Sequence, residues 1–282
     1  MVKSFKKDIV VSICMITYNH EAYIKQAIEG VCIQQTNFKV ELIIADDCST
    51  DQTEKVIREE IKKHPDTISV KYTRQRKNLG MMPNFIAALQ QCTGKYIALC
   101  EGDDYWTDPL KLQKQVDFLE ANPEFSICFH PVKIFNQNTL AYEKDTITRD
   151  VDEITDVHEL CKGNYIHTPS VVLRNDFTIP SWFDKVHLGD WSLYMLSIKG
   201  KKIFKFREEM GVYRLHSQSI WSKHDQEKRN SLTQENVRML LKNLKSNTTV
   251  KNILKRRIQK KGIKHLVIKL VKKMKRFLKV QL

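Results

Sequence analysis

The sequence lacks the short patterns that define several common protein classes. Its nine glycines are never spaced as Gly-x-Gly, so the phosphate-binding turn of a dinucleotide-dependent dehydrogenase is absent, as is the Walker pattern. No run reaches the ~18 apolar residues of a membrane-spanning helix. The apolar run at 9–16 follows three lysines, but it is short and has no small-residue cleavage pattern, which argues against a signal peptide. We therefore expect a cytoplasmic protein.

Cysteine pairs and internal repeats are also missing. The seven cysteines are odd in number, scattered along the chain and never spaced as Cys-x-x-Cys. Several of them lie inside apolar runs. This usage is typical of buried thiols in a reducing compartment, and it does not indicate a disulfide framework.

Acidic residues are absent from the segment 251–282, which contains thirteen lysines and arginines. The formal net charge of the whole chain is +14, so 14 − 13 leaves about +1 for everything before residue 251. Basic charge therefore describes the end of the chain and not the body. The body has no RNP-like, zinc or helix-turn-helix signature, so we do not expect it to bind nucleic acid.

Within this basic segment, apolar residues recur at helical spacing, at positions 263, 266, 267, 270, 271, 274, 277 and 278. The pattern predicts an amphipathic helix with a cationic face. Each lysine or arginine near an anionic leaflet contributes about 1 kcal/mol, so we expect residues 251–282 to hold the protein peripherally on the inner face of the plasma membrane. A terminal helix packed on the body and an arm that binds nucleic acid are the alternatives.

The first hundred residues alternate between apolar runs of strand length and segments of helical period, which predicts an α/β fold with a parallel sheet. The predicted strands cover 9–16, 40–45, 68–72 and 96–100, and the helices cover 22–32, 53–63, 83–92 and 108–121. Beyond residue 126 the pattern is irregular, with strands near 126–135, 170–173, 202–206 and 211–215 and a helix from about 190. We expect one domain over 8–224, divided after residue 104, and a helical basic tail over 225–282.

Polar and aromatic side chains follow each of the four predicted parallel strands. Ligands bind at the carboxyl ends of such strands, so these side chains are candidates for a site. They are Thr17, Tyr18 and Asn19 after the first strand, Asp46 and Asp47 after the second, Arg74, Arg76 and Lys77 after the third, and Glu101, Asp103 and Asp104 after the fourth. An aromatic ring, carboxylates and cations on one edge suit a nucleotide diphosphate.

The acidic cluster Glu101-Gly102-Asp103-Asp104 adds a chemical requirement. Adjacent carboxylates alone would repel a diphosphate. They predict Mg²⁺ or Mn²⁺, which binds one or two carboxylates and completes its shell with phosphate oxygens and water. The alternative is a solvated turn in which Asp104 or Asp108 caps the next helix.

Three segments in this order, 11–19, 41–51 and 94–104, resemble the family 2 glycosyltransferases. The resemblance covers residues 8–125 strongly and 160–222 weakly. It implies an inverting enzyme of the GT-A fold, with a Rossmann-like, mostly parallel nucleotide-binding half at 8–104. A smaller mixed sheet on the acceptor side would lie within 105–224. The Gln-x-x-Arg-Trp signature of processive members is absent, which implies a non-processive enzyme of the bacterial surface-polysaccharide type.

The resemblance also implies roles for the residues that match its motifs. Tyr18 would flank the base, Asp47 would hydrogen-bond it, and Asp46 would lie beside it. Asp103 and Asp104 would match the metal and ribose carboxylates of the DXD motif, and Glu101 stands where the family more often has Asp. The diphosphate would be reached by one of three cations, which are Arg74, Arg76 and Lys77.

An inverting transfer needs a base, because the acceptor hydroxyl must lose its proton as it attacks the anomeric carbon. The metal neutralises the departing diphosphate, so one carboxylate suffices. The segment Leu188-Gly189-Asp190-Trp191 resembles the family's element for this role, which implies Asp190 as the base. An ordinary helix N-cap is the alternative. Trp182 and Trp191 are candidates for stacking on sugar faces of the acceptor, and the alternative for each is a core position.

The segment Tyr213-Arg214-Leu215-His216-Ser217 resembles a family segment whose histidine contacts the metal or the diphosphate, which implies His216 as a ligand. Together these residues predict transfer of a sugar from a nucleotide diphosphate, such as UDP, to a glycan or lipid-linked acceptor in surface polysaccharide or lipopolysaccharide assembly. A metal-dependent nucleotidyltransferase, a nucleic-acid-binding protein without catalysis, and a donor-binding pseudo-enzyme are the alternatives.

Overall fold

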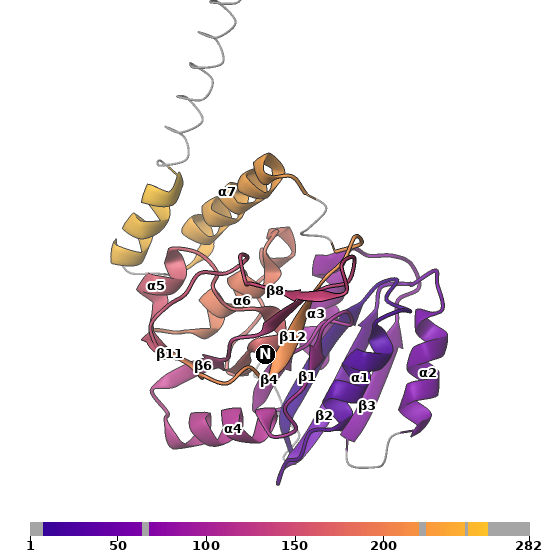
Figure 1. Cartoon of the computed structure of the whole chain (residues 1–282). Coiled ribbons are helices and arrows are strands. Elements are labelled where there is room, and N and C mark those ends of the chain that lie inside the picture. The colour runs from indigo at the N-terminus through magenta and orange to yellow at the C-terminus, as the bar shows by residue number, and fades with distance from the viewer. Residues whose placement is uncertain (1–7, 64–67, 220–223, 246–247, 259–282) are drawn as a thin grey trace, which may run out of the picture.

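The computed structural model of the protein describes residues 8–63, 68–219, 224–245 and 248–258. Its main sheet has eight strands in the order β3-β2-β1-β4-β10-β6-β11-β9, and a second sheet has four in the order β5-β12-β7-β8 (Figure 1). The strands are β1 (Ile9–Thr17), β2 (Lys39–Asp46), β3 (Ile68–Arg74), β4 (Tyr96–Leu99), β5 (Tyr105–Trp106), β6 (Phe125–Phe129), β7 (Lys133–Asn136), β8 (Ala141–Glu143), β9 (Ile154–Thr155), β10 (Val172–Arg174), β11 (Lys202–Lys205) and β12 (Gly211–Leu215).

Helices cover both faces of the main sheet. They are α1 (Ile24–Cys32), α2 (Thr53–Lys63), α3 (Met81–Gln91), α4 (Lys111–Ala121), α5 (Val157–Cys161), α6 (Gly189–Ser197) and α7 (Gln226–Asn243), with a further helix over 248–258 and short 3₁₀ turns at Thr168–Ser170 and Phe183–Lys185. The predicted α/β fold, with a mostly parallel sheet and a smaller second sheet, is confirmed.

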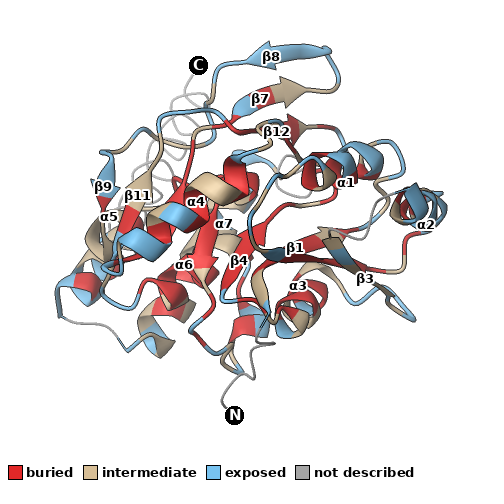
Figure 2. Ribbon diagram, turned by 90° about the horizontal axis from the view of Figure 1, so that it is seen from below, coloured by how far each residue is buried: buried red, intermediate tan, exposed pale blue. Residues whose placement is uncertain are grey.

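The alternation of apolar side chains along the buried strands builds two cores. In β1, Val11, Ile13 and Met15 pack with α1, α2 and α4 on one face, whereas Cys14 packs with α3, α6 and α7 on the other. This follows from the pleat, which turns successive side chains to opposite faces of the sheet. Figure 2 shows the result, with β1 and β4 buried at the centre and β8 and α2 exposed at the periphery.

The first four predicted strands run in parallel as β3-β2-β1-β4, within a residue or two of their expected bounds. The prediction of one strand over 126–135 was wrong. The structure has β6 and β7 there, in different sheets, and Pro131 lies in the break between them. Proline lacks the N–H that a central strand must donate, which explains why the chain leaves the main sheet at this point.

The C-terminal helices extend the core of the body and are not a separate unit. Val237 and Leu240 of α7, and Val250 and Leu254 of the helix over 248–258, are all buried in the core that contains α3 and α6. The expected boundary after residue 224 therefore does not separate two cores. The amphipathic segment predicted at 263–278 lies outside the described residues.

All seven cysteines are free thiols, and five of them are buried. This agrees with the prediction that the cysteines are mostly buried thiols. Among the described residues, no helix combines the length and apolarity that a crossing of the bilayer demands.

The packing of the helix over 248–258 is testable with one substitution and a neighbouring control. Leu254→Ala removes a fully buried side chain, so we expect the free energy of unfolding to fall by about 2–5 kcal/mol. Lys255→Ala, at the next and exposed position, should change it by less than about 0.5 kcal/mol. Urea denaturation monitored by circular dichroism measures both, and equal stability of the two variants would show that this helix is not part of the core.

Candidate active site

The strand register places the candidate residues of the first half side by side. Thr17 pairs with Asp46, and Asp46 pairs with Arg74, so the ends of β1, β2 and β3 share one edge of the sheet. The loop after β1 is fastened to the loop after β2. The Asn19 side chain accepts the backbone N–H of Thr50 at 2.8 Å, and Asn19 itself has a φ of 55°, a left-handed conformation that asparagine tolerates.

The carboxylates of Asp46 and Asp47 hold these loops in place. Asp46 is fully buried and accepts hydrogen bonds from Ser49 and from the Tyr72 hydroxyl. Asp47 accepts the backbone N–H groups of Leu79 and Gly80, at 2.7 and 2.9 Å. Both residues therefore shape this edge of the sheet through hydrogen bonds to the protein. We call it the nucleotide edge, because the sequence predicts that a nucleotide binds there.

The three cations at the end of β3 and just after it differ in their partners. Arg74 forms an ion pair with Glu54 at 3.0 Å and donates to the Ser49 carbonyl. Arg76 and Lys77 are exposed, and neither has an ion pair within the described part of the chain. Tyr18 is 41% exposed at the same edge, so its ring is accessible for stacking.

The segment Glu101-Gly102-Asp103-Asp104, which we call the acidic turn, packs directly on the end of β1. Its second position requires glycine. A Cβ on Gly102 would lie 2.7 Å from Thr17 Oγ1 and 2.9 Å from Ile24 Cδ1, which is closer than such atoms approach. The Gly102 backbone N–H donates to the Ile16 carbonyl at 2.9 Å. The turn is thereby fixed against the nucleotide edge.

Arg214 of β12 organises the acidic turn from the second half of the chain. Its backbone N–H donates to Asp104 Oδ1 and its Nε donates to the Asp103 carbonyl, both at 2.8 Å. The guanidinium is buried and also donates to Gln26 and Gln137. Sequence reasoning gave Arg214 no role, and its place two residues before His216 was the available signal.

His20, Asp103 and His216 form a group of potential metal ligands, with one donor atom from each lying within 4.8 Å of the other two. Asp103 Oδ2 lies 2.9 Å from His216 Nε2 and 3.8 Å from His20 Nε2. Burial alone would raise the pKa of Asp103, but the two histidines lower it overall. Two of the predicted ligands, Asp103 and His216, are thus brought together, whereas Glu101 and Asp104 stand outside this group. His20 was missed, although it directly follows Tyr18-Asn19 in the sequence.

The donor set fits a divalent cation. Four buried atoms around it have no hydrogen-bond partner, and these are Asp103 Oδ1, Asp104 Oδ2, His20 Nδ1 and His216 Nδ1. Buried polar atoms without partners are costly and mark places where a ligand or water belongs. A carboxylate with two imidazoles is a set that first-row divalent metals accept.

Asp190 occupies the first turn of α6, and its charge acts on Glu101 of the acidic turn. The Asn164 side chain donates to Asp190 Oδ2 at 2.6 Å. Burial raises the pKa of Asp190 above its usual range, against the opposing effects of the Trp191 backbone N–H and Asn164. Burial also raises the pKa of Glu101 to about 8, with further contributions from the charges of Asp103 and Asp190. Asp190 and Glu101 are therefore electrostatic neighbours across the two halves.

Trp191 does not lie on an accessible surface, which corrects its expected position as an acceptor contact. It is 1% exposed, its indole N–H donates to the Leu160 carbonyl at 3.0 Å, and the Arg257 guanidinium lies 4.8 Å from the centre of its ring. Its apolar surface is already covered by the core. Trp182 is half-buried and packs against the edge of the same core.

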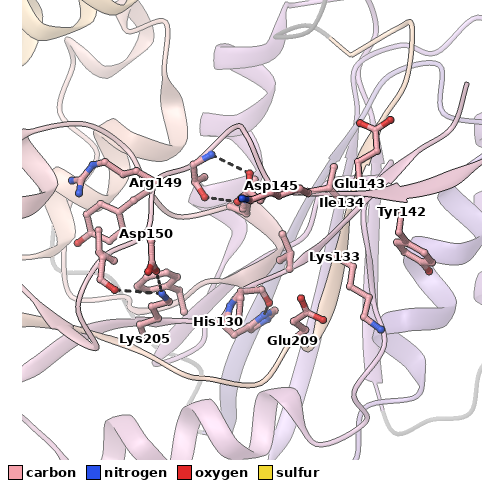
Figure 3. Close-up of a pocket in the computed structure, with 18 residues that line it drawn as sticks. His130, Lys133, Ile134, Tyr142, Glu143, Asp145, Arg149, Asp150, Lys205 and Glu209 are labelled. Carbon is pink, nitrogen blue, oxygen red and sulfur yellow. Dashed lines mark hydrogen bonds and ion pairs between the residues drawn. The ribbon is translucent and has the colours of Figure 1, made fainter. Parts of the chain in front are cut away.

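A pocket of about 620 Å³ lies beyond the acidic turn on the second half of the chain (Figure 3). It is lined by the ends of β6 and β11, by β7, β8 and the segment 144–151, and by Tyr165 and His167. The His167 ring lies 4.9 Å from the ring of Tyr213, a tyrosine whose pKa is raised by burial and by the charges of Asp104 and Glu101. Tyr213 thus stands between the pocket and the carboxylates.

The fold of this protein is similar to that of solved structures that contain nucleotide sugars. The crystal structure of Staphylococcus aureus TarS 1–349 in complex with UDP-GlcNAc has a TM-score of 0.66 and 17% identity, covering 87% of this chain and 70% of that one. The mannosyltransferase PcManGT from Pyrobaculum calidifontis, in complex with GDP-Man and Mn²⁺, has a TM-score of 0.62 and 14% identity, covering 92% and 71%. These likenesses define a GT-A fold.

Residues 12–177 match the family model described as Glycosyl transferase family 2, so the chain belongs to that family. An uncharacterized protein of Mycobacterium tuberculosis is 41% identical over 213 residues, which are 74% of this chain. The chain spans 60% of the length of that relative. The Bacillus subtilis protein TuaG, named as a candidate teichuronic acid biosynthesis glycosyltransferase, is 28% identical over 76% of this chain and 82% of its own length.

Proposed function

We propose that the protein transfers a sugar from a nucleotide diphosphate to an acceptor hydroxyl with inversion, and that Asp190 is the base. The observation that carries this proposal is the convergence of Asp190, from α6, on the acidic turn that follows β4. The donor is a UDP-sugar or a close relative, which the complex of TarS with UDP-GlcNAc supports. Assembly of a surface polysaccharide is the setting, in line with the name of TuaG.

The carboxyl groups of Glu101 and Asp190 have different roles in this proposal. Glu101, with a pKa of about 8, keeps its proton at neutral pH. Asp190 is the proposed base of the pair, because its raised pKa makes its carboxylate a better proton acceptor than that of an exposed aspartate. The Asn164 amide donates to one carboxylate oxygen, which leaves the other to accept the proton of the acceptor hydroxyl. The attacking oxygen gains nucleophilicity as that proton leaves.

Asp103 and His216 would hold a divalent cation at the other end of the site. Bound there, the cation would neutralise the charge of the departing diphosphate. Tyr18 and the exposed cations Arg76 and Lys77 lie at the nucleotide edge. There the ring of Tyr18 is available to the nucleobase, and the cations are available to the phosphates.

The acceptor occupies the pocket of Figure 3. β6 lies two strands from β4 in the main sheet, and neighbouring strands are about 4.8 Å apart, so the end of β6 is about 10 Å from the acidic turn. The volume of about 620 Å³ is within the range of small-ligand sites. The charged side chains of the lining balance, since four are basic (Lys133, Lys144, Arg149 and Lys205) and four acidic (Glu143, Asp145, Asp150 and Glu209). Such a lining favours an uncharged glycan over a polyanion.

The first test replaces the base. Asp190→Asn keeps the shape of the side chain but cannot accept the proton, so we expect kcat to fall by about 10²–10⁴ while donor affinity changes little. Release of nucleoside diphosphate measures the rate, and calorimetry measures donor binding. Asp184→Asn, at an exposed position shortly before α6, serves as the control. Turnover by Asp190→Asn at the rate of the unmodified protein would remove this assignment.

The second test removes the metal. In excess EDTA we expect transfer to cease, because the diphosphate would leave without a cation to neutralise it. Addition of Mn²⁺ or Mg²⁺ beyond the chelator should restore the rate. Full activity in EDTA, measured on protein that was dialysed against the chelator beforehand, would contradict a metal-dependent mechanism.

The third test concerns the acceptor. Tyr142 lines the pocket and is 59% exposed, so Tyr142→Ala should raise the KM for the acceptor by about threefold to tenfold through loss of stacking on the sugar. The KM for the donor should not change. Leu140→Ala, an exposed residue just before β8 that does not line the pocket, is the matched control. An equal rise in both KM values for Tyr142→Ala would argue against an acceptor site here.

A further inference from the structure

We infer that His20 is a third protein ligand to the divalent cation, so that the centre holds a first-row transition ion such as Mn²⁺ in preference to Mg²⁺. This inference rests on the proposed metal-dependent function, and it adds a residue outside the acidic turn and outside the segment 213–217. The loops after β1, β4 and β12 would each supply one ligand.

The geometry of the three side chains carries the inference. The two Nε2 atoms lie 3.8 and 2.9 Å from the same oxygen, Asp103 Oδ2. The imidazole rings of His20 and His216 are 5.9 Å apart and nearly perpendicular, at 87°, so they approach the carboxylate from different directions. Two ligand atoms of one ion lie about 3 Å apart when each bond is about 2.1 Å long. Both separations from Asp103 Oδ2 are within about 1 Å of that value.

The surroundings of the group indicate a missing partner. The side chains of His216, Asp103 and His20 are 1%, 13% and 15% exposed. Seven buried side-chain N or O atoms of the described residues lack a hydrogen-bond partner, and three of these belong to this group. Leaving such an atom unpaired costs about 1–3 kcal/mol. Asp103 Oδ1 belongs to the carboxylate that both imidazoles face, so a bound ion or its water shell would satisfy this atom, whereas the two Nδ1 atoms lie on the other side of rings whose Nε2 atoms face Asp103.

The chemistry of the donors selects among ions. Mg²⁺ prefers oxygen ligands and gives up water reluctantly, whereas imidazole suits first-row transition ions. Two imidazoles and one carboxylate therefore disfavour Mg²⁺ more than they disfavour Mn²⁺. A site made from Asp103 and His216 alone would discriminate less.

His20 also ties the cation to the nucleotide edge. Its backbone N–H donates to Thr53 Oγ1 at 2.8 Å, and it is two residues from the exposed ring of Tyr18. His20 would thus fix the loop that bears Tyr18 to the metal through its side chain and to α2 through its backbone. Binding of the cation would order the loop that bears Tyr18, on whose ring the nucleobase is proposed to stack.

The experiment measures metal binding without turnover. Mn²⁺ is titrated into the full chain in the presence of UDP, and the free ion is followed by electron paramagnetic resonance, with Mg²⁺ as competitor. We expect His20→Ala and His20→Gln to weaken Mn²⁺ binding by about tenfold or more, while Mg²⁺ binding changes little, so that selectivity falls. Pulsed resonance should detect two coupled histidine nitrogens in the unmodified protein and one in either variant. His187→Ala, at an exposed histidine, should leave all of these values unchanged.

The outcomes separate this inference from the function on which it rests. Unchanged affinity and two nitrogen couplings in folded His20 variants would overturn the role of His20 while the metal-dependent function stands. If Mn²⁺ does not bind the unmodified protein even with UDP, both are overturned. Circular dichroism confirms that the variants are folded, and agreement between the alanine and glutamine variants excludes an effect of side-chain volume.

Discussion

The hydrogen bonds of Arg214 to the acidic turn hold the candidate site together. The turn follows β4, in the half of the chain that bears the nucleotide edge, whereas Arg214 belongs to β12 of the smaller sheet. Its backbone fixes the Asp104 carboxylate and its guanidinium fixes the Asp103 carbonyl. Because the guanidinium is buried among carboxylates and aromatic rings, its charge compensates the carboxylates at close range, where water could do so only weakly. Together with the pairing of β5 and β12, this bridge keeps His216 beside Asp103.

The four carboxylates of the site remain close because their charges are distributed unequally. The pKa of Asp103 is lowered by its histidines, in spite of burial, and it stays ionised. Burial and the nearby charges raise the pKa of Glu101 and of Asp104, which favours their protonated forms. Neighbouring acids commonly separate their titrations in this way, which assigns different tasks to identical groups. One carboxylate is thereby suited to bind a cation and another, Asp190, to accept a proton.

The sequence was most informative where a local pattern determines the structure. The apolar runs of β1, β2 and β4 are typical of buried parallel strands, and the acidic turn follows the last of them. The sequence was least informative where contacts with distant segments determine the structure. Residues 126–135 are mostly apolar, and although Pro131 marks a break, the pairing partners show that β6 and β7 belong to different sheets. Nothing local to Trp191 reveals that Arg257 covers it. The position of His20 beside Asp103 likewise depends on how the ends of β1 and β4 meet.

The stacking of Arg257 on Trp191 has a practical meaning for handling the protein. Arg257 also donates to the Cys161 carbonyl. The end of the described chain therefore contacts both α5 and α6, the helix that contains Asp190. A recombinant version shortened to remove the basic residues should keep everything up to Ile258. Cutting earlier would loosen α6, which bears the proposed base, and the resulting loss of turnover could be mistaken for loss of a membrane anchor.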